Sequence, residues 1–340
     1  MTTAGLPPRL LESSVVIFVW DVDKTYLRTD FGSWKGLVRA ALERAEQKAS
    51  FPGAAALLRE VGLLPEARVV FVSGSPRQMR RVIEEKLRLD GVRCDGIALK
   101  PNLSNVLRGR LRAVREQVGY KLPLLLERRA KLGFGPPEVL FGDDAESDAF
   151  IYSLYADVLA GRVDARLVAA IVERARAYKD DRARLAALLP KVPRGDAVRR
   201  IFIHLETRTP PSRFDRYGRR VAPVFNYFQA AVVLLEDGVI DAAAVVRVAA
   251  DMVTRGGYKV GALANSLQDL YRRGLCRAET AEALGEQTLR AEDELRALGS
   301  AAQIVAAFRL RLRELGREHV APPPLPLAPE IDYLRLLDED

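Results

Sequence analysis

The amino-acid sequence predicts an α/β fold, with a doubly wound and mostly parallel sheet followed by a C-terminal all-helical region. Three observations support this prediction. Short, β-branched apolar runs alternate with longer segments of helical periodicity over roughly the first 210 residues. The runs are apolar at consecutive positions, as expected for strands that are buried on both faces of a parallel sheet. Beyond residue 223 such runs stop and helix-forming residues predominate.

Each strand is expected at a short apolar run that ends in polar or turn-forming residues. In chain order these runs are 14–20, 68–72, 94–99, 138–141 and 198–205. Helices are expected where apolar residues recur at helical spacing. These segments are 34–48, 54–61, 78–87, 106–117, 122–132 and 165–189. Proline and glycine support the boundaries, because Pro76 stands where a helix would begin and Gly133 interrupts another.

The same patterns divide the chain into four parts. Residues 1–209 are predicted to form the α/β domain, with a helical insertion at about 160–195. Two prolines interrupt the pattern next, and 210–223 are predicted to be a linker. Residues 224–318 are predicted to form a helical domain of several short helices, and 319–340 a proline-rich tail.

Composition favours a globular, cytoplasmic protein. Hydrophobic residues make up 49% of the 340 residues, and two cysteines are too few for a disulfide framework. We expect neither a signal peptide nor a transmembrane segment, because no basic-then-apolar leader and no bilayer-length apolar run is present. The net charge of +8 could favour contact with phosphates, nucleic acid or an anionic membrane, but solvated helix faces without a dedicated anionic partner are the favoured explanation.

Acidic and hydroxyl side chains stand at the ends of three predicted strands. Asp21 and Asp23 follow the first strand, Ser73 the second and Asp143 the fourth. The functional groups of doubly wound sheets gather at the carboxyl ends of the strands, so we expect these side chains to meet. One aspartate can attack phosphorus to form an aspartyl-phosphate, while a second carboxyl protonates the leaving alcohol and then activates water. Magnesium would neutralise the repulsion between the carboxylates and a phosphoryl group.

These segments resemble the motifs of the haloacid dehalogenase (HAD) superfamily of phosphohydrolases. Asp21-Val22-Asp23-Lys24-Thr25 is similar to the first motif. Ser73 is similar to the second motif, whose hydroxyl holds the transferring phosphoryl group, and the stretch from Gly142 to Asp148 is similar to the fourth. The resemblance implies a HAD-like, Rossmannoid sheet.

The resemblance also implies a role for each acid. Asp21 would be the nucleophile and a metal ligand, and Asp23 the general acid and base, with its backbone carbonyl on the metal. Asp143 would bind Mg²⁺ directly, and either Asp144 or Asp148 would support the metal.

The third motif of the superfamily is a single basic residue. Lys121 is the favoured candidate, because it is predicted to open the helix that leads into the strand before Asp143. Its charge would keep Asp21 ionised and balance the phosphoryl oxygens. Lys100 and Lys131 are the alternatives.

Within the superfamily, the chain is similar to the phosphatidate phosphatase catalytic domain of the actin-patch-associated type. The segments that carry this similarity are Pro52-Gly53, Phe71 to Pro76, Tyr120-Lys121 and Gly142 to Tyr152. We therefore expect a magnesium-dependent phosphomonoester hydrolase that works through an aspartyl-phosphate, with a phospholipid such as phosphatidate as one candidate substrate.

Two other functions stay open. The substrate would be a nucleic-acid end or a phosphoprotein, or the HAD domain would be an inactive scaffold whose helical region binds a partner. The presence of all the acidic motifs argues against a scaffold. The expected partners are a phosphorylated substrate of unknown identity and, at the periphery, anionic lipid, whereas nucleic acid is less favoured.

Overall fold

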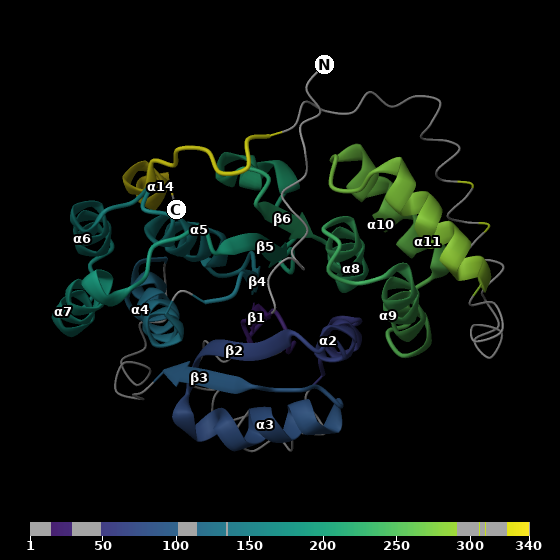
Figure 1. Cartoon of the computed structure of the whole chain (residues 1–340), viewed down its shortest axis with the longest axis horizontal. Helices are drawn as coiled ribbons and strands as arrows, with labels where there is room; N and C mark the ends of the chain where they lie inside the picture. The colour runs from purple at the N-terminus through teal and green to yellow at the C-terminus, as the bar shows by residue number, and fades with distance from the viewer. Residues whose placement is uncertain are drawn as a thin grey trace.

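The computed structural model of the protein describes residues 15–28, 49–100, 114–133, 135–290, 306, 310 and 325–339. Within these residues, one six-stranded sheet lies between two layers of helices (Figure 1). Its order is β3-β2-β1-β4-β5-β6, and all neighbouring strands are parallel. The strands are β1 Val16–Trp20, β2 Ala67–Pro76, β3 Gly96–Lys100, β4 Glu138–Asp143, β5 Val198–His204 and β6 Val221–Val224. The predicted doubly wound α/β fold is confirmed.

The winding of the sheet reverses between β1 and β4. β1 pairs with β2 on one side and with β4 on the other. At such a switch point the connections after the two strands run to opposite faces of the sheet, which leaves room for a site at the carboxyl ends. Asp21 directly follows β1 and Asp143 ends β4, so both lie at this point.

The sheet is buried because its strands are apolar on both faces. Successive side chains of a strand point to opposite faces. In β1, Phe18 and Trp20 belong to one hydrophobic cluster, whereas Ile17 and Val19 belong to the other. Both faces therefore require a cover of helices.

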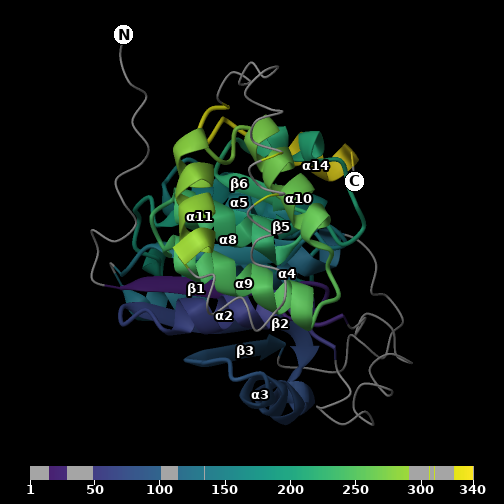
Figure 2. The ribbon, with the colours of Figure 1, turned by 90° about the vertical axis from the view of Figure 1, so that its right-hand side faces the viewer.

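Helices from both halves of the chain cover the first face. They are α2 Ala54–Gly62, α3 Arg80–Leu89, α8 Tyr227–Glu236, α9 Ala242–Thr254, α10 Val260–Arg272 and α11 Ala278–Arg290. Figure 2 looks onto the sheet from the side on which α8 to α11 lie. The second face is covered by α4 Val114–Leu132, α5 Asp148–Leu159, α6 Ala165–Arg174, α7 Lys179–Leu188 and α14 Tyr333–Glu339.

Short 3-10 helices complete the described secondary structure: η3 Arg77–Met79, η5 Leu189–Lys191 and η6 Pro211–Tyr217. Both α6 and α7 fall inside the helical insertion predicted at about 160–195. The helix predicted at 34–48 lies outside the described residues. Among the described helices, none is both long and apolar enough to cross a membrane.

The prediction of a linker at 210–223 is wrong for most of its length. Residues 211–217 form η6, and β6 begins at Val221 as the edge strand next to β5. This strand was not predicted because it contains Pro223. Proline cannot donate a hydrogen bond to a sheet, so its presence argues against a central strand. At a sheet edge the missing donor is tolerated.

The helices after β6 are part of the same core as the sheet. Phe228 and Val232 of α8 lie in the hydrophobic cluster that contains Phe18 and Trp20 of β1. The rings of Trp20 and Tyr227 are stacked with centroids 5.4 Å apart. The predicted domain limits 1–209 and 224–318 remain predictions, but α8 packs on β6, and α9 packs on α8 and α2, so these helices do not stand apart from the sheet.

Helix α4 is continuous from Val114 to Leu132, where two helices were expected. Gly119, a weak helix former, lies between the two predicted segments. In the structure it allows close packing, because a Cβ at this position would lie 3.3 Å from Cβ of Ala177. Lys121 consequently lies within a helix and not at its start.

The C-terminal tail returns to the α/β layer. The backbone N–H groups of Arg219 and Arg220 donate to the carbonyls of Pro326 and Leu327, at 2.9 and 3.1 Å. Further on, α14 packs on α6. The described part of the predicted tail 319–340 therefore ends in a docked helix.

Candidate active site

The carboxyl ends of three neighbouring strands bring the predicted site residues together. Asp21 follows β1, Ser73 lies in β2 and Asp143 ends β4, and β1 lies between the other two strands. Lys121 joins them from α4. All four side chains are buried, with at most 1% of any residue exposed.

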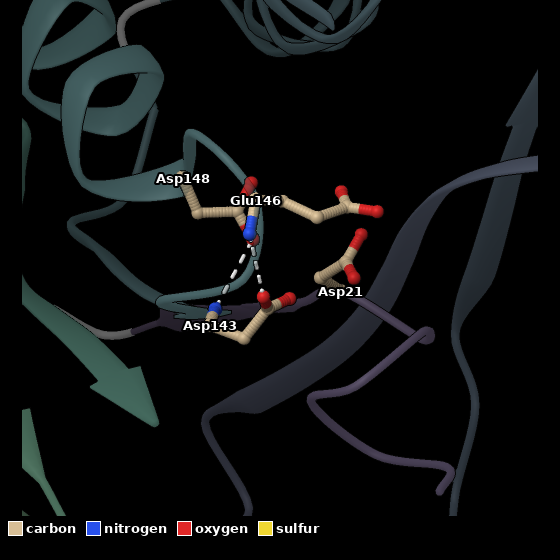
Figure 3. A group of neighbouring side chains, drawn as sticks. All are labelled: Asp21, Asp143, Glu146 and Asp148. Atoms are coloured by element: carbon tan, nitrogen blue, oxygen red, sulfur yellow. Dashed lines mark hydrogen bonds between the residues drawn. The ribbon is translucent and has the colours of Figure 1, made fainter. Parts of the chain in front are cut away.

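Four carboxylates face one another at this point (Figure 3). Asp21, Asp143, Glu146 and Asp148 each offer an oxygen that lies within 4.8 Å of the others. The Nζ atom of Lys121 lies 3.1 Å from Oδ1 of Asp21 and 2.9 Å from Oε2 of Glu146, and it also pairs with Asp148. The lysine balances one negative charge of the four.

The loop after β4 is shaped by its own carboxylates. Oδ1 of Asp143 accepts hydrogen bonds from the backbone N–H groups of Ala145 and Glu146, at 2.8 and 2.9 Å. Oδ2 of Asp148 accepts from the N–H of Asp143 at 3.2 Å. The close approach of Asp148 requires glycine at position 142, because a Cβ there would lie 2.4 Å from Oδ2 of Asp148.

Burial and mutual repulsion perturb the ionisation of these side chains. Burial raises the pKa of Asp21 and of Asp143 well above the ordinary range; Lys121 lowers both, and the neighbouring carboxylates raise them further. Burial lowers the pKa of Lys121, but Asp148, Asp21 and Glu146 raise it by more, so the net shift is upward. The ammonium therefore stays charged.

The cluster fits a divalent cation. Neither oxygen of the buried Asp21 carboxylate accepts a hydrogen bond from the described residues. A buried carboxylate without donors is strongly destabilising unless a cation compensates it. Lys121 supplies a single positive charge for four carboxylates, and a ligand set made only of oxygens suits a hard cation such as Mg²⁺.

Asp23 lies beside two serine hydroxyls of β2. Oγ of Ser75 donates to Oδ2 of Asp23 at 2.9 Å, and Oγ of Ser73 donates to the same oxygen at 3.2 Å. Burial raises the pKa of Asp23 to about 7; Glu146 adds to the rise, and the two serine hydroxyls oppose it. A carboxyl group with a pKa near neutrality can both give and take a proton at physiological pH.

Comparison with known proteins agrees with this geometry. Residues 16–169 match the family of phosphatidate phosphatase APP1 catalytic domains. The match confirms the predicted resemblance for this segment and supports a phosphatase. No curated protein and no solved structure matches the chain significantly.

Residues 16–169, the APP1-like segment, contain both candidates for supporting the metal, Asp144 and Asp148. The structure places their side chains in different surroundings. Asp148 lies in the carboxylate cluster. Asp144 instead accepts hydrogen bonds from the N–H and hydroxyl of Thr207, at 2.8 Å each, and from the N–H of Thr209 at 2.9 Å. The Asp144 side chain therefore holds the loop after β5.

The three lysine candidates of the APP1-like segment are separated in the same way. Lys121 contacts the carboxylate cluster. Lys131 is exposed near the end of α4, and Lys100 ends the edge strand β3, which β2 separates from β1.

Two residues of this site were not predicted. Glu146 lies in the acidic stretch from Gly142 to Asp148, but whether its side chain points toward Lys121 depends on the turn that Asp143 stabilises. Ser75 stands two residues after Ser73, where the register of β2 against β3 is irregular, so no regular strand pattern indicated that both hydroxyls contact Asp23.

Residues beyond the APP1-like segment contact the loop that carries Asp23. Tyr227 of α8 donates its hydroxyl to the carbonyl of Thr25, and the Nδ1 atom of His204 lies 3.2 Å from the carbonyl of Lys24. Thr25 in turn donates its hydroxyl to Oδ2 of Asp143 at 3.3 Å. The first helix of the C-terminal region therefore helps to position the site.

Proposed function

We propose that the protein is a Mg²⁺-dependent phosphomonoester hydrolase that works through an aspartyl-phosphate on Asp21. One observation carries this proposal. Inside a segment that matches a phosphatase family, the buried Asp21 carboxylate accepts no hydrogen bond from the described residues and faces Lys121 and three acids of the β4 loop. This arrangement leaves Asp21 free to act as nucleophile and metal ligand.

Asp21 and Asp143 would hold Mg²⁺, together with the backbone carbonyl that the family resemblance assigns to Asp23. Asp148 and Glu146 would support the ion from the side of Lys121, because both already pair with that ammonium. When bound, the metal would neutralise the charge of the phosphoryl group.

In the first step an oxygen of Asp21 attacks phosphorus. The ester P–O bond breaks, its electron pair goes to the leaving oxygen, and protonated Asp23 gives its proton to that oxygen. In the second step Asp23 takes a proton from water, and the water oxygen attacks phosphorus. The bond between phosphorus and Asp21 then breaks, which releases inorganic phosphate and restores the Asp21 carboxylate.

Lys121 and Ser73 would assist without forming bonds to phosphorus. The ammonium of Lys121, 3.1 Å from Oδ1 of Asp21, favours the ionised nucleophile and balances the phosphoryl oxygens. The hydroxyl of Ser73 would donate to a phosphoryl oxygen.

Phosphatidate is the substrate we would test first, because the matching family is described by that substrate. A lipid substrate would also give the protein a peripheral contact with anionic membranes. A nucleic-acid end or a phosphoprotein remains the alternative substrate for the same chemistry.

The test is phosphate release from p-nitrophenyl phosphate and from phosphatidate in mixed micelles, with Mg²⁺ or with EDTA. We expect magnesium-dependent turnover that Asp21→Asn abolishes. Asp144→Asn is the matched control, because this acid lies beside Asp143 but outside the carboxylate cluster; it should retain most of the activity.

Turnover that survives in Asp21→Asn would refute the proposed nucleophile. A folded wild-type protein that neither releases phosphate nor gains thermal stability with Mg²⁺ would favour the inactive scaffold. Faster release from phosphorylated oligonucleotides or phosphopeptides than from phosphatidate would change the substrate but keep the reaction.

A further inference from the structure

Ser75 contacts the proposed general acid more closely than Ser73 does. Its Oγ lies 2.9 Å from Oδ2 of Asp23, compared with 3.2 Å for Oγ of Ser73, and the residue is only 2% exposed. Both hydroxyls donate to the same carboxylate oxygen. The other oxygen, Oδ1 of Asp23, is buried and has no hydrogen-bond partner among the described residues.

Both serines reach one carboxylate from the irregular end of β2. The strand continues to Pro76, but its register against β3 shifts between Ser73 and Pro76. The two serines are also linked, because the N–H of Ser75 donates to Oγ of Ser73 at 3.0 Å. A side chain on Gly74 would collide with Tyr120, since a Cβ there would lie 2.2 Å from the Tyr120 hydroxyl.

A serine hydroxyl has one proton to donate. Ser73 therefore cannot donate at the same time to Asp23 and to a phosphoryl oxygen. If Ser73 turns to a bound phosphoryl group, the anchored oxygen of Asp23 keeps only the hydrogen bond from Ser75.

We propose that Ser75 is a positioning residue that fixes Oδ2 of Asp23, so that Oδ1 faces the reacting oxygen while Ser73 binds the phosphoryl group. This inference rests on the proposed function, because it assigns a partner to the general acid of that reaction. Ser75 itself would contact neither substrate nor metal.

A positioning role predicts that the effect of Ser75→Ala depends on the leaving group. An alkyl alcohol needs a proton to depart, whereas p-nitrophenolate leaves readily without one. The value of kcat/KM includes the step that breaks the ester bond and not the later hydrolysis. Since general acid catalysis contributes about 10²–10⁴-fold, we expect kcat/KM to fall by about 10-fold or more for an alkyl phosphate and by less than about 3-fold for p-nitrophenyl phosphate.

Three further variants separate this role from others. Ser73→Ala should lower kcat/KM for both substrates by similar factors, because it removes a contact to the phosphoryl group. Ser153→Ala is the matched control: Ser153 is also buried, lies on α5, and its hydroxyl has no partner among the described residues. Ser75→Cys fills the volume of serine but donates weakly, so it should repeat the pattern of Ser75→Ala even if the alanine variant does not fold.

The outcomes separate the inference from the function on which it rests. A selective loss for the alkyl phosphate, with the Mg²⁺-induced rise in melting temperature retained, supports the role of Ser75. Equal losses for both substrates, or behaviour like that of Ser153→Ala, would overturn the inference and leave the phosphatase intact. A wild-type protein that hydrolyses neither substrate would overturn both.

Discussion

Replacing Lys121 by methionine removes the ammonium that faces Asp21, Glu146 and Asp148. Methionine has a similar length and no charge, so the change is mainly electrostatic. Removing one partner of a buried ion pair typically destabilises a protein by about 3–5 kcal/mol, because the remaining charge is uncompensated. We expect a loss of this size in the free energy of unfolding at pH 8 without metal.

The loss should shrink at lower pH. The pKa values of Asp21, Asp143 and Asp148 are raised by burial in the native protein, and Lys121 opposes this rise. Without Lys121 they rise further, so the native state binds more protons than the unfolded state, and stability falls as pH increases. One additional proton changes the free energy by about 1.4 kcal/mol per pH unit, or by about 3 kcal/mol between pH 8 and pH 5.5.

Urea unfolding of the wild-type protein and of Lys121→Met, at pH 5.5 and pH 8 in the presence of EDTA, measures these differences in the free energy of unfolding. Lys131→Met is the matched control, because Lys131 is exposed on the same helix. It should change stability by less than about 0.5 kcal/mol at either pH. A destabilisation by Lys121→Met that is the same at both pH values, or that is larger at pH 5.5, would refute this account of the carboxylate cluster.

Three other predictions concern the metal, the loop after β4 and the tail. Mg²⁺ should raise the melting temperature more at pH 8 than at pH 5.5, because protons compete for carboxylates whose pKa is raised; the reverse order would contradict the site. Gly142→Ala should displace Asp148, abolish most of the Mg²⁺-induced stabilisation and lower activity at least ~10-fold. The control Gly195→Ala should have none of these effects, because a Cβ at position 195 would meet open space. Tyr333→Phe removes the hydroxyl that donates to buried Asp157 at 2.6 Å, so urea unfolding should show a loss of about 1–3 kcal/mol; an unchanged midpoint would argue against that contact.

The strands and their acidic ends could be predicted because local sequence determines them. β1 is a continuous apolar run and β4 contains a shorter one, Val139 to Phe141, and the residues that follow a buried parallel strand must emerge at the carboxyl edge. Asp21 and Asp143 therefore lie where they were expected. The topology of the sheet then brings the two together without further information from the sequence.

The direction of each polar side chain could not be predicted in the same way. Asp144 and Glu146 are neighbours of Asp143 in one acidic stretch, yet Glu146 turns to Lys121 and Asp144 to Thr207. The partner of Asp144 follows β5 and is more than sixty residues away in sequence, so no local pattern reveals it.

One strand was predicted too short and another was missed, in both cases for reasons of local conformation. The second strand was expected to end before Ser73, but β2 continues to Pro76, and this extension is what places Ser75 beside Asp23. The edge strand β6 was missed because it contains Pro223.

The return of the tail to the sheet has a consequence for how the protein is made. A ribosome delivers the chain from its N-terminus, and domains generally begin to fold as they emerge. The contact of Tyr333 with Asp157 and the bonds of Pro326 and Leu327 to the segment before β6 cannot form until all the intervening helices have been synthesised. Until then a nascent chain would leave buried positions of α5 and α6 uncovered, which makes the surface of these two helices the expected site of chaperone binding during translation.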